Sequence, residues 1–597
     1  MRKMGILWLV MALVCATPAW SSVGEGKTTP AAKKASGPAA AKSKATSKRA
    51  QPAASPVLAN AAIASEVEQL KGMIEAQSRQ IAAQQKQIED LQSQIAGRTS
   101  AAASAVPSTG ASANAAPATA VADAANASPT PAETMAGLPP ASTAAASAAL
   151  AKRPLLSKGQ VAGSEPESPL QFRIGSAYVT PVGFMDITGV WRSKTGGSSI
   201  GTNFGGIPYG NTIPANLSEF RMSMQNSRIG FRVDADVKGA HVIGYMEADY
   251  LGVDPGNVAV SSNSNSLRSR LYWVDISKGS WEFLGGQTWS LITPGRSGIS
   301  PLPGNIFFSQ NMDTNYQAGL FWGRIPELRF VYHPSHKVAL ALAIDSPEQY
   351  IGGSAGGGAI TLPASASGYI GTELDNGNTT LSVANAAPDL IAKLAFDPSK
   401  HFHLEIGGVE RQFRTYNPVS NIRYSATGGG GFLNLGFDLF PGFRILTNNY
   451  WSDGGGRYIF GQAPDLIVRA NGSPSLVHTG STVTGFEWGV HHSMIFAYYG
   501  GIYVSRNAEL DTNGAPMGYG YAGSPTGQNR SIQEGTFGLN QTLWSNPHYG
   551  ALNFITQYSY LTRSPWNIPT AQPRNASLNM VFFDLRYSLP GSAPAIK

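Results

Sequence analysis

Arginine is the side chain of this 597-residue sequence whose type and placement could do chemistry. Residues 171–589 contain 21 Arg and only 6 Lys, so arginine is the main cation of this part of the chain. A guanidinium group is planar, permanently charged and able to bind a carboxylate or phosphate through two hydrogen bonds. A row of such groups along a water-filled passage would favour anions. The candidates for this row are Arg228, Arg232, Arg268, Arg270, Arg296, Arg324, Arg411 and Arg444.

The same arginines allow a second interpretation, in which each one pairs with a carboxylate of the surrounding wall. Glu247, Asp249, Glu405 and Asp438 lie in the same part of the sequence and could form such pairs. Paired arginines would fill space and stabilise the wall without selecting solutes. The sequence leaves both interpretations open.

Residues for covalent or metal chemistry are sparse. The single cysteine, Cys15, lies in the N-terminal segment. His401 and His403 alternate with Glu405 on one predicted strand, a spacing that can bind metal but is more often an ordinary polar rim beside a turn. No segment carries a phosphate-binding glycine loop or a recognisable Ser-His pair. We therefore predict no enzyme, no catalytic residue, no metal site and no cofactor.

The elements that must position the arginines follow from the composition. Only 14% of residues are charged, against about 25% in typical soluble domains, while 67 residues are Gly and 10% are aromatic. The mean hydropathy is −0.12, and after the first 20 residues no apolar run is long enough for a membrane-spanning helix. Few charges with many Gly and aromatic residues are typical of a transmembrane β-barrel, in which apolar and polar residues alternate.

Short and long connections alternate along residues 171–589, and their order predicts the number of strands. The short turns lie at 238–239, 277–280, 333–336, 398–400, 441–442, 491–492 and 546–548. The long loops lie at about 193–218, 252–266, 292–315, 346–388, 417–430, 453–482, 507–531 and 563–576. This order predicts an all-β barrel of sixteen antiparallel strands, with short periplasmic turns and long external loops. A division of residues 316–332 at Ile325-Pro326 is the alternative to this count.

Alternation within the predicted strands gives the direction of the charged side chains. In residues 228–237, Ile229 and Phe231 alternate with Arg228 and Arg232. A charged side chain facing lipid costs about 2–4 kcal/mol at the middle of the membrane, so the charged faces must point inward. The loop at 292–315 is rich in Pro and aromatic residues. We expect it either to fold into the lumen, with Arg296 near the narrowest point, or to pack against a neighbouring protomer.

Four segments precede the barrel. Residues 1–22 are predicted to be a secretory signal peptide, and residues 23–62 a disordered basic Ala/Lys/Pro tail. Residues 63–96 repeat β-branched residues at every seventh position, which predicts an α-helical coiled coil of two or three chains. Residues 97–170 are an Ala/Ser/Pro linker, and residues 590–597 form a tail after the last strand. Residues 1–150 hold 13 Lys+Arg and 8 Asp+Glu, a net +5, so most of the total charge of +7 lies outside the barrel.

One motif resembles a known family. Leu267-Arg268-Ser269-Arg270, followed by Gly286-Gln287-Thr288-Trp289-Ser290, is similar to the DcaP-like outer-membrane porins, as is the order of signal peptide, coiled coil, linker and barrel. The resemblance implies a trimeric sixteen-stranded porin with a periplasmic coiled coil and channels for small anionic solutes such as dicarboxylates. It places Arg268 and Arg270 in the lumen. Ser269, the longer basic tail and residues 590–597 depart from the family pattern.

These observations lead us to expect a homotrimeric porin of the bacterial outer membrane that passes small polar, mainly anionic solutes. The expected partners are outer-membrane lipid, further copies of the chain through barrel walls and coiled coil, and peptidoglycan or another anionic envelope polymer at the basic tail. An exported chain meets no nucleic acid. A different hypothesis is an envelope tether or adhesin anchored by the barrel, and a third is an outer-membrane lipase.

Overall fold

The computed structural model describes residues 168–196, 200–252, 265–301, 317–353, 357–378 and 382–591. The predicted signal peptide, basic tail and coiled coil, nearly all of the linker and residues 592–597 lie outside them. None of the helices in these residues is long and apolar enough to span a membrane.

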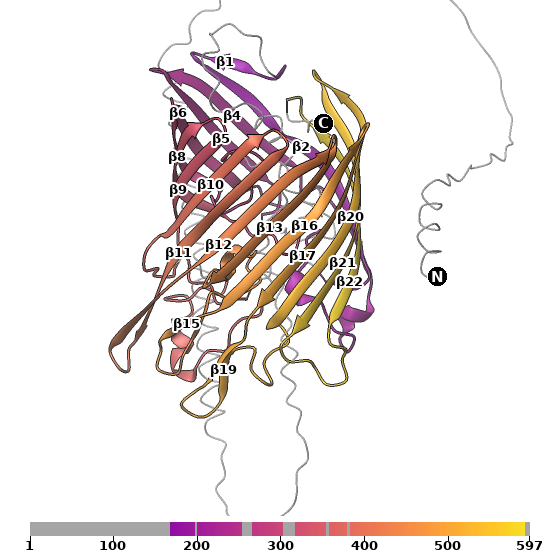
Figure 1. The fold of residues 1–597 in the computed structure, drawn as a ribbon. Coiled ribbons are helices and arrows are strands. Elements are labelled where there is room, and N and C mark those ends of the chain that lie inside the picture. The colour runs from indigo at the N-terminus through magenta and orange to yellow at the C-terminus, as the bar shows by residue number, and fades with distance from the viewer. Residues whose placement is uncertain are drawn as a thin grey trace, which may run out of the picture. The chain divides into compact units, whose positions relative to one another are not determined.

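Within the described residues, an antiparallel sheet closes on itself through the pairing of β2 with β22 (Figure 1). The strands β3 and β4 pair with successive parts of β2 and form one interrupted wall strand, so the wall has sixteen strands. A short strand β1 (Phe172–Ile174) pairs with the start of β2. The wall strands are β2 (Ala177–Arg192), β3 (Glu219–Ser223) with β4 (Arg228–Val237), β5 (Ala240–Asp249), β6 (Arg268–Lys278), β7 (Trp281–Trp289), β8 (Arg324–Ser335), β9 (Val338–Asp345), β10 (Asp389–Ser399), β11 (Phe402–Asn417), β12 (Ile422–Phe440), β13 (Phe443–Asp453), β16 (His478–Val490), β17 (Ser493–Val504), β20 (Asn529–Asn546), β21 (Gly550–Pro565) and β22 (Ala576–Ser588). The predicted sixteen-stranded barrel is confirmed, and β8 runs through Pro326 without division.

All seven predicted short turns join consecutive wall strands at one end of the barrel. Both ends of the wall lie at this same end, where the Ser168 hydroxyl donates a hydrogen bond of 3.1 Å to the Pro590 carbonyl (Figure 1). An even number of antiparallel strands requires this arrangement.

One predicted long loop is wrong. Residues 417–430 are mostly strand, because β11 continues to Asn417 and β12 begins at Ile422, and this hairpin extends past its neighbours (Figure 1). The glycines at 429–431 pair in register with both neighbouring strands, and Gly428 pairs with Arg411 of β11. A Cβ on Gly430 would lie 2.7 Å from the Ser452 Cβ and the Trp451 carbonyl oxygen and 2.9 Å from the Tyr450 ring. Gly430 therefore allows β12 to pass close to β13.

The two faces of the wall differ as the alternation predicted. On β4, Ile229 and Phe231 are 49% and 37% exposed on the outside, while Arg228 and Arg232 are 3% and 6% exposed on the inside. The apolar face therefore points outward and the charged face inward.

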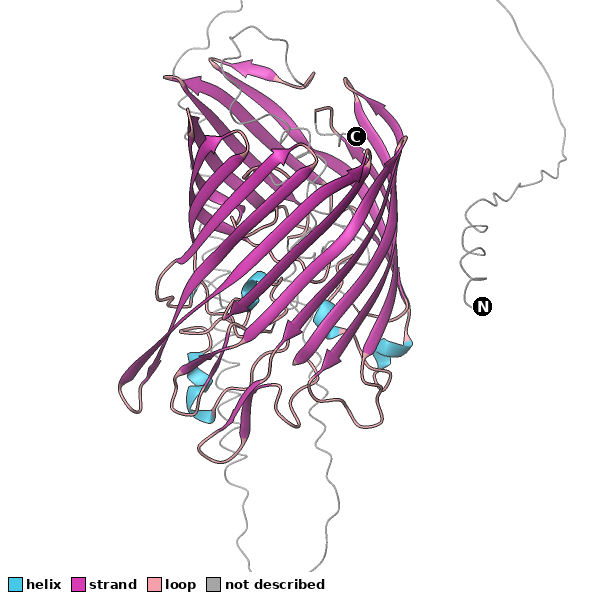
Figure 2. Cartoon of the chain, viewed as in Figure 1, coloured by secondary structure: helices cyan, strands magenta, loops and turns pink. Residues whose placement is uncertain are grey.

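The long loops pack together at the opposite end of the barrel from the short turns. They contain short helices and two small hairpins that the sequence did not predict (Figure 2). Phe321 packs on Phe432 and Tyr450 of the wall, and Trp322 packs on Phe460 of another loop, so these loops share an apolar core. The elements are η1 (Phe204–Gly206), η2 (Ile213–Asn216), η4 (Ala364–Tyr369), η6 (Gly456–Tyr458), β14 (Leu466–Val468) with β15 (Pro474–Leu476), and β18 (Asn507–Leu510) with β19 (Pro516–Tyr519).

Candidate functional site

The loop after β7 crosses the inside of the barrel. The Arg296 guanidinium donates from Nη1 to Oε2 of Glu487 at 2.7 Å, and its Nη2 contacts the other carboxylate oxygen. Glu487 lies on β16, the twelfth wall strand, whereas β7 is the fifth, so the contact joins nearly opposite parts of the wall. Burial and the Glu487 carboxylate act in opposite directions on the pKa of Arg296, and the net effect is to raise it.

Backbone groups fix the same loop along β10 and β11. The amide of Gly295 donates to Oε2 of Glu405 at 3.1 Å, and the amide of Gly298 donates to Oδ2 of Asp397 at 2.7 Å. Lys393 Nζ donates to the carbonyl of Thr293 at 2.7 Å. These contacts place residues 292–301 inside the barrel, as one of the two sequence hypotheses predicted, and not against another protomer. Residues 302–315 of the same predicted loop lie outside the described residues.

Three of the predicted arginines converge on two carboxylates of β5. Arg270 donates from Nε to Glu247 at 2.7 Å and from Nη1 to Asp249 at 2.9 Å. Arg268 binds Asp249 through Nε and Nη2 at 3.1 and 3.0 Å. Arg228 lies 3.8 Å from Glu247. This side of the inner wall is therefore a compact network of alternating charges.

The other predicted arginines lie apart from this network. Arg232 binds Asp234 through two hydrogen bonds of 2.8 and 2.7 Å, and Arg444 donates to Asp438 at 2.7 Å. The Arg324 guanidinium lies 5.6 and 5.7 Å from the ring centroids of Trp289 and Trp322.

Arg411 joins the wall to the loops. Its Nε donates to Asp389 of β10 at 2.9 Å, and its Nη1 lies 2.8 Å from Asp465 of the loop after β13. It also donates to the carbonyls of Gly454 and Glu348. One buried guanidinium thus binds two separate loops to β10 and β11.

Among the described residues, seven of the predicted arginines lie within 4 Å of a carboxylate oxygen, namely Arg228, Arg232, Arg268, Arg270, Arg296, Arg411 and Arg444. Arg324 packs on Trp289 and Trp322. Of the four acidic partners proposed from the sequence, Glu247, Asp249 and Asp438 bind arginine. Glu405 instead lies 3.3 Å from Lys393. The pairing interpretation describes the wall at these positions.

Sequence reasoning omitted Arg586 from the candidates. Its guanidinium carbon lies 4.0 Å from the ring centroid of Phe184, and that of Arg228 lies 5.2 Å from the same centroid. Arg586 contacts Asp186 at 2.7 Å and Asp584 at 3.0 Å. In the sequence Arg586 stands between Leu585 and Tyr587 and two positions after Asp584, so a period of two could have identified it.

Two acidic groups in the loops, Glu348 and Asp465, have a raised pKa. Burial, together with the nearby negative charge of Asp375, raises the pKa of Glu348 to about 7. Burial also raises the pKa of Asp465, although Arg411 acts in the opposite direction. The loop packing therefore includes a carboxyl group that titrates near neutral pH.

No protein-family model and no curated protein matches the sequence. Among solved structures, the chain is similar to the outer membrane channel DcaP of Acinetobacter baumannii, with 16% identity, a TM-score of 0.49 and coverage of 69% of this chain and 98% of that chain. It is also similar to OmpT of Vibrio cholerae, with 11% identity, a TM-score of 0.39 and coverage of 70% and 99%. OprB of Pseudomonas putida has 10% identity, a TM-score of 0.39 and coverage of 68% and 94%.

Proposed function

We propose that the chain is a porin, a passive diffusion channel for small polar solutes in a bacterial outer membrane. The observation that carries this proposal is the closed wall of sixteen strands, apolar outside and charged inside, with one loop crossing its interior. A closed barrel satisfies every backbone hydrogen bond within the wall, which a structure exposed to lipid must do. A polar interior suits the passage of hydrated solutes.

We further propose a preference for anionic, dicarboxylate-like solutes. The support is the set of inward arginines on β4, β6 and β22, which are held in fixed positions by their carboxylate partners. Because the partners cancel much of the arginine charge, the preference should be modest.

The assembly and location are part of the same proposal. The chain enters the wall at the short-turn end, where Ser168 contacts Pro590, and short turns of such barrels face the periplasm. The coiled coil at 63–96 would then lie in the periplasm and support a homotrimer. The basic tail at 23–62 would reach peptidoglycan or another anionic polymer of the envelope.

A second candidate, an envelope tether or adhesin, is favoured by one observation. The long loops bury Phe321, Trp322 and Tyr458 in an apolar core at the external end of the barrel. A barrel that serves only as an anchor can be closed by such a loop core, whereas a channel must keep an open path for solutes beside the core.

Single-channel recording separates the two candidates. Purified, correctly folded protein in a planar bilayer should give stepwise currents that close in three steps, and a KCl gradient should give a small reversal potential of the sign for anions. A cation-selective current would refute the proposed preference for anions but would still support a porin. Folded protein without any conductance would refute the porin and favour the tether. The prediction that the chain is not an enzyme is checked by the absence of phospholipid hydrolysis.

A further inference from the structure

His401 and His403, at the turn between β10 and β11, have different surroundings. The side chain of His401 is 52% exposed and lies 3.0 Å from Asp438, as expected for a polar residue beside a turn. The side chain of His403 is only 7% exposed and lies between two carboxylates of the inner wall. The sequence predicted a polar rim for both residues, and only His401 fits that description.

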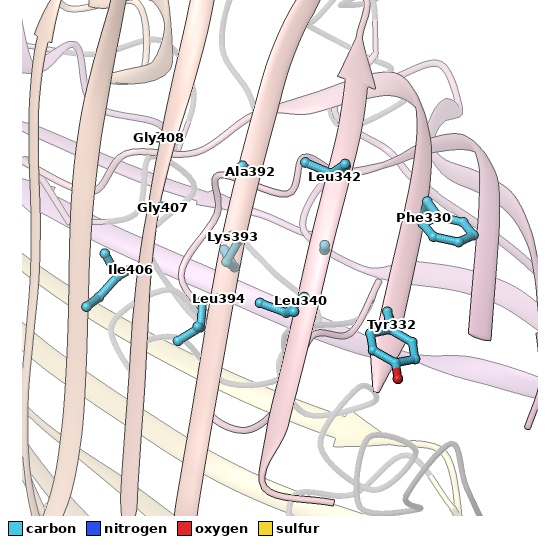
Figure 3. Close-up of a pocket in the computed structure, with 11 residues that line it drawn as sticks. Phe330, Tyr332, Leu340, Leu342, Ala392, Lys393, Leu394, Ile406, Gly407 and Gly408 are labelled. Carbon is cyan, nitrogen blue, oxygen red and sulfur yellow. The ribbon is translucent and has the colours of Figure 1, made fainter. Parts of the chain in front are cut away.

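His403 belongs to a group of four charged or titratable side chains inside β10 and β11. The outer face of these strands is part of an apolar groove of about 400 Å³, where Ile406 projects (Figure 3). Lys393 and Glu405 alternate with the outward-facing residues and are 5% and 1% exposed on the inside. We call Lys393, Asp397, His403 and Glu405 the charged cluster. It faces the interior of the barrel, where the crossing loop lies.

His403 contacts both carboxylates of the charged cluster. Its Nδ1 lies 2.7 Å from Oδ1 of Asp397, and its Nε2 lies 3.4 Å from Oε1 of Glu405. An ionised carboxylate has no hydrogen to donate, and a neutral imidazole has a single N–H. A neutral His403 would therefore turn a lone pair toward one of the two carboxylates. The ring faces both of them favourably only when each nitrogen carries a proton and the side chain is positively charged.

The other oxygen of each carboxylate holds the crossing loop. Oε2 of Glu405 accepts from the amide of Gly295 at 3.1 Å, and Oδ2 of Asp397 accepts from the amide of Gly298 at 2.7 Å. A Cβ on Gly295 would lie 2.8 Å from Oε1 of Glu405, so a side chain there would displace the carboxylate. His403 thus contacts the oxygen opposite the one that each carboxylate offers to the loop, and it fixes the direction of both acceptors.

We propose that His403, in its charged form, is the positioning residue that holds the crossing loop in the channel, an inference that rests on the proposed porin function. It acts through Asp397 and Glu405. Without its charge, Lys393 would be the only cation of the cluster for two carboxylates, and the loop amides would lose acceptors of fixed direction. Arg296 would stay bound to Glu487 across the barrel. The loop would therefore be released on the side of β10 and β11 and remain attached on the other side.

A thiol on the crossing loop reports this release. Thr293 is 4% exposed, and T293C changes little in side-chain size. The sequence has one cysteine, Cys15 in the predicted signal peptide, so T293C would be the only thiol of the mature chain. The measured quantity is the rate at which a water-soluble methanethiosulfonate reagent modifies this thiol in protein reconstituted into lipid vesicles.

The test compares H403Q with H403K, both in the T293C background. H403Q removes the charge and should speed modification about tenfold or more, the order expected for the loss of a hydrogen bond to a charged group. H403K restores a positive charge with donors for both carboxylates and should return the rate to that of T293C alone. H401Q is the matched control, because the partner of His401, Asp438, binds Arg444 of the wall.

The outcomes of the labelling test are separate from the folding of one variant. H403N is a second neutral variant, which replaces H403Q if the latter does not fold. An unchanged rate in the neutral variants would overturn the proposal. Equally fast modification of H403K and H403Q would also overturn it, because the charge of His403 would then not hold the loop.

Single-channel recordings of the same variants separate this inference from the porin proposal. H403Q should show more frequent current fluctuations than the native protein, whereas H403K and H401Q should not. Faster labelling of H403Q in folded protein without any conductance would reject the porin and support the role of His403 in holding the loop. Conductance in all variants with an unchanged labelling rate would support the porin and reject that role.

Discussion

Two sectors of the barrel, β8 to β11 and β13 to β20, differ on both of their faces. Outside, the first sector presents Leu342 and Ile406, whereas the second presents Thr482 and Asn449. Inside, the first sector carries charges and the second mainly amides and hydroxyls. The inner charged residues of the first sector are Glu327, Arg329, Lys393, Glu405 and Arg411, and the inner uncharged residues of the second are Asn448, Ser481, Thr536 and Asn540.

The difference shows that the same alternation of inward and outward side chains can produce an inner face that binds loops through charges or one that is mainly uncharged. The charged inner face lies where loops bind the wall, since Lys393, Glu405 and Arg411 all contact loop residues. These charges act as attachment points, and each attachment is a hydrogen bond or ion pair between distant parts of the chain. The second sector also receives attachments from the connection between β7 and β8, at Glu487, which binds Arg296, and at Glu534, which accepts from the amide of Ala318 at 2.8 Å. Charge inside this barrel therefore marks where loops are held, as well as where solutes could be selected.

The largest expected effect tests the charged inner face. R411M would leave Asp389 and Asp465 buried without their guanidinium, and removing one partner of a buried pair costs about 3–5 kcal/mol. N540L makes a comparable change in the uncharged sector and should cost no more than about 1 kcal/mol. Urea unfolding of both variants in lipid vesicles measures the difference. Equal losses would mean that the two inner faces do not differ in the way described.

The second prediction tests the outer faces. L342R places a charge on the apolar wall and should lower the free energy of unfolding by about 2–4 kcal/mol. T484R should cost clearly less, because Thr447 and Asn449 are close enough to accept hydrogen bonds from the new side chain. The same unfolding measurement in vesicles compares them, with L342M as the control for loss of the leucine shape. A larger cost for T484R than for L342R would contradict the contrast between the outer faces.

The strand pattern could be predicted because its signals are local. The period of two placed Arg228 and Arg232 on the inner face, and turn residues placed all seven short connections. The glycine run at 428–431 was misread because the residues that crowd Gly430, at 450–452, lie on a neighbouring strand. The hairpin of β14 and β15 was missed because its three residues at 466–468 are all buried and show no alternation.

The arginines of the candidate site could be predicted from the sequence, but most of the carboxylates that they bind could not. Arginine on an inner face must find a partner, and the sequence offered carboxylates near Arg268 and Arg270. The partner of Arg296 is 191 positions away, and Arg411 binds a loop residue in Asp465. Such contacts depend on which loops fold inward, and that depends on the packing of the whole interior. The sequence therefore identified the cations and left their function undecided.

The third prediction concerns the crossing loop, which joins the two sectors. E487Q removes the charge that binds Arg296 and should weaken this attachment by about 1.5–3 kcal/mol, the range for hydrogen bonds to charged groups. A less firmly held loop should increase the frequency of current fluctuations and the mean single-channel conductance. D438N, which changes another inner carboxylate that contacts Arg444, is the matched control. Identical recordings from E487Q and the native protein would show that the loop does not limit the current.

The smallest expected effect concerns pH and the loops at the long-loop end of the barrel, which are attached to the charged sector through Arg411. The pKa of Glu348 is raised from its ordinary value of 4.5 to about 7, so the folded state binds this proton more tightly than the unfolded state does. Below pH 4.5 the group is protonated in both states. Between pH 4.5 and about 7 the unfolded state loses the proton first, and stability therefore falls as pH rises; above pH 7 this dependence ends. The decrease should appear as faster proteolysis of residues 346–388 in membranes at pH 8 than at pH 5, after correction for protease activity. E348Q cannot titrate and should reduce the difference between the two pH values, and an undiminished difference in E348Q would assign the pH dependence to another group.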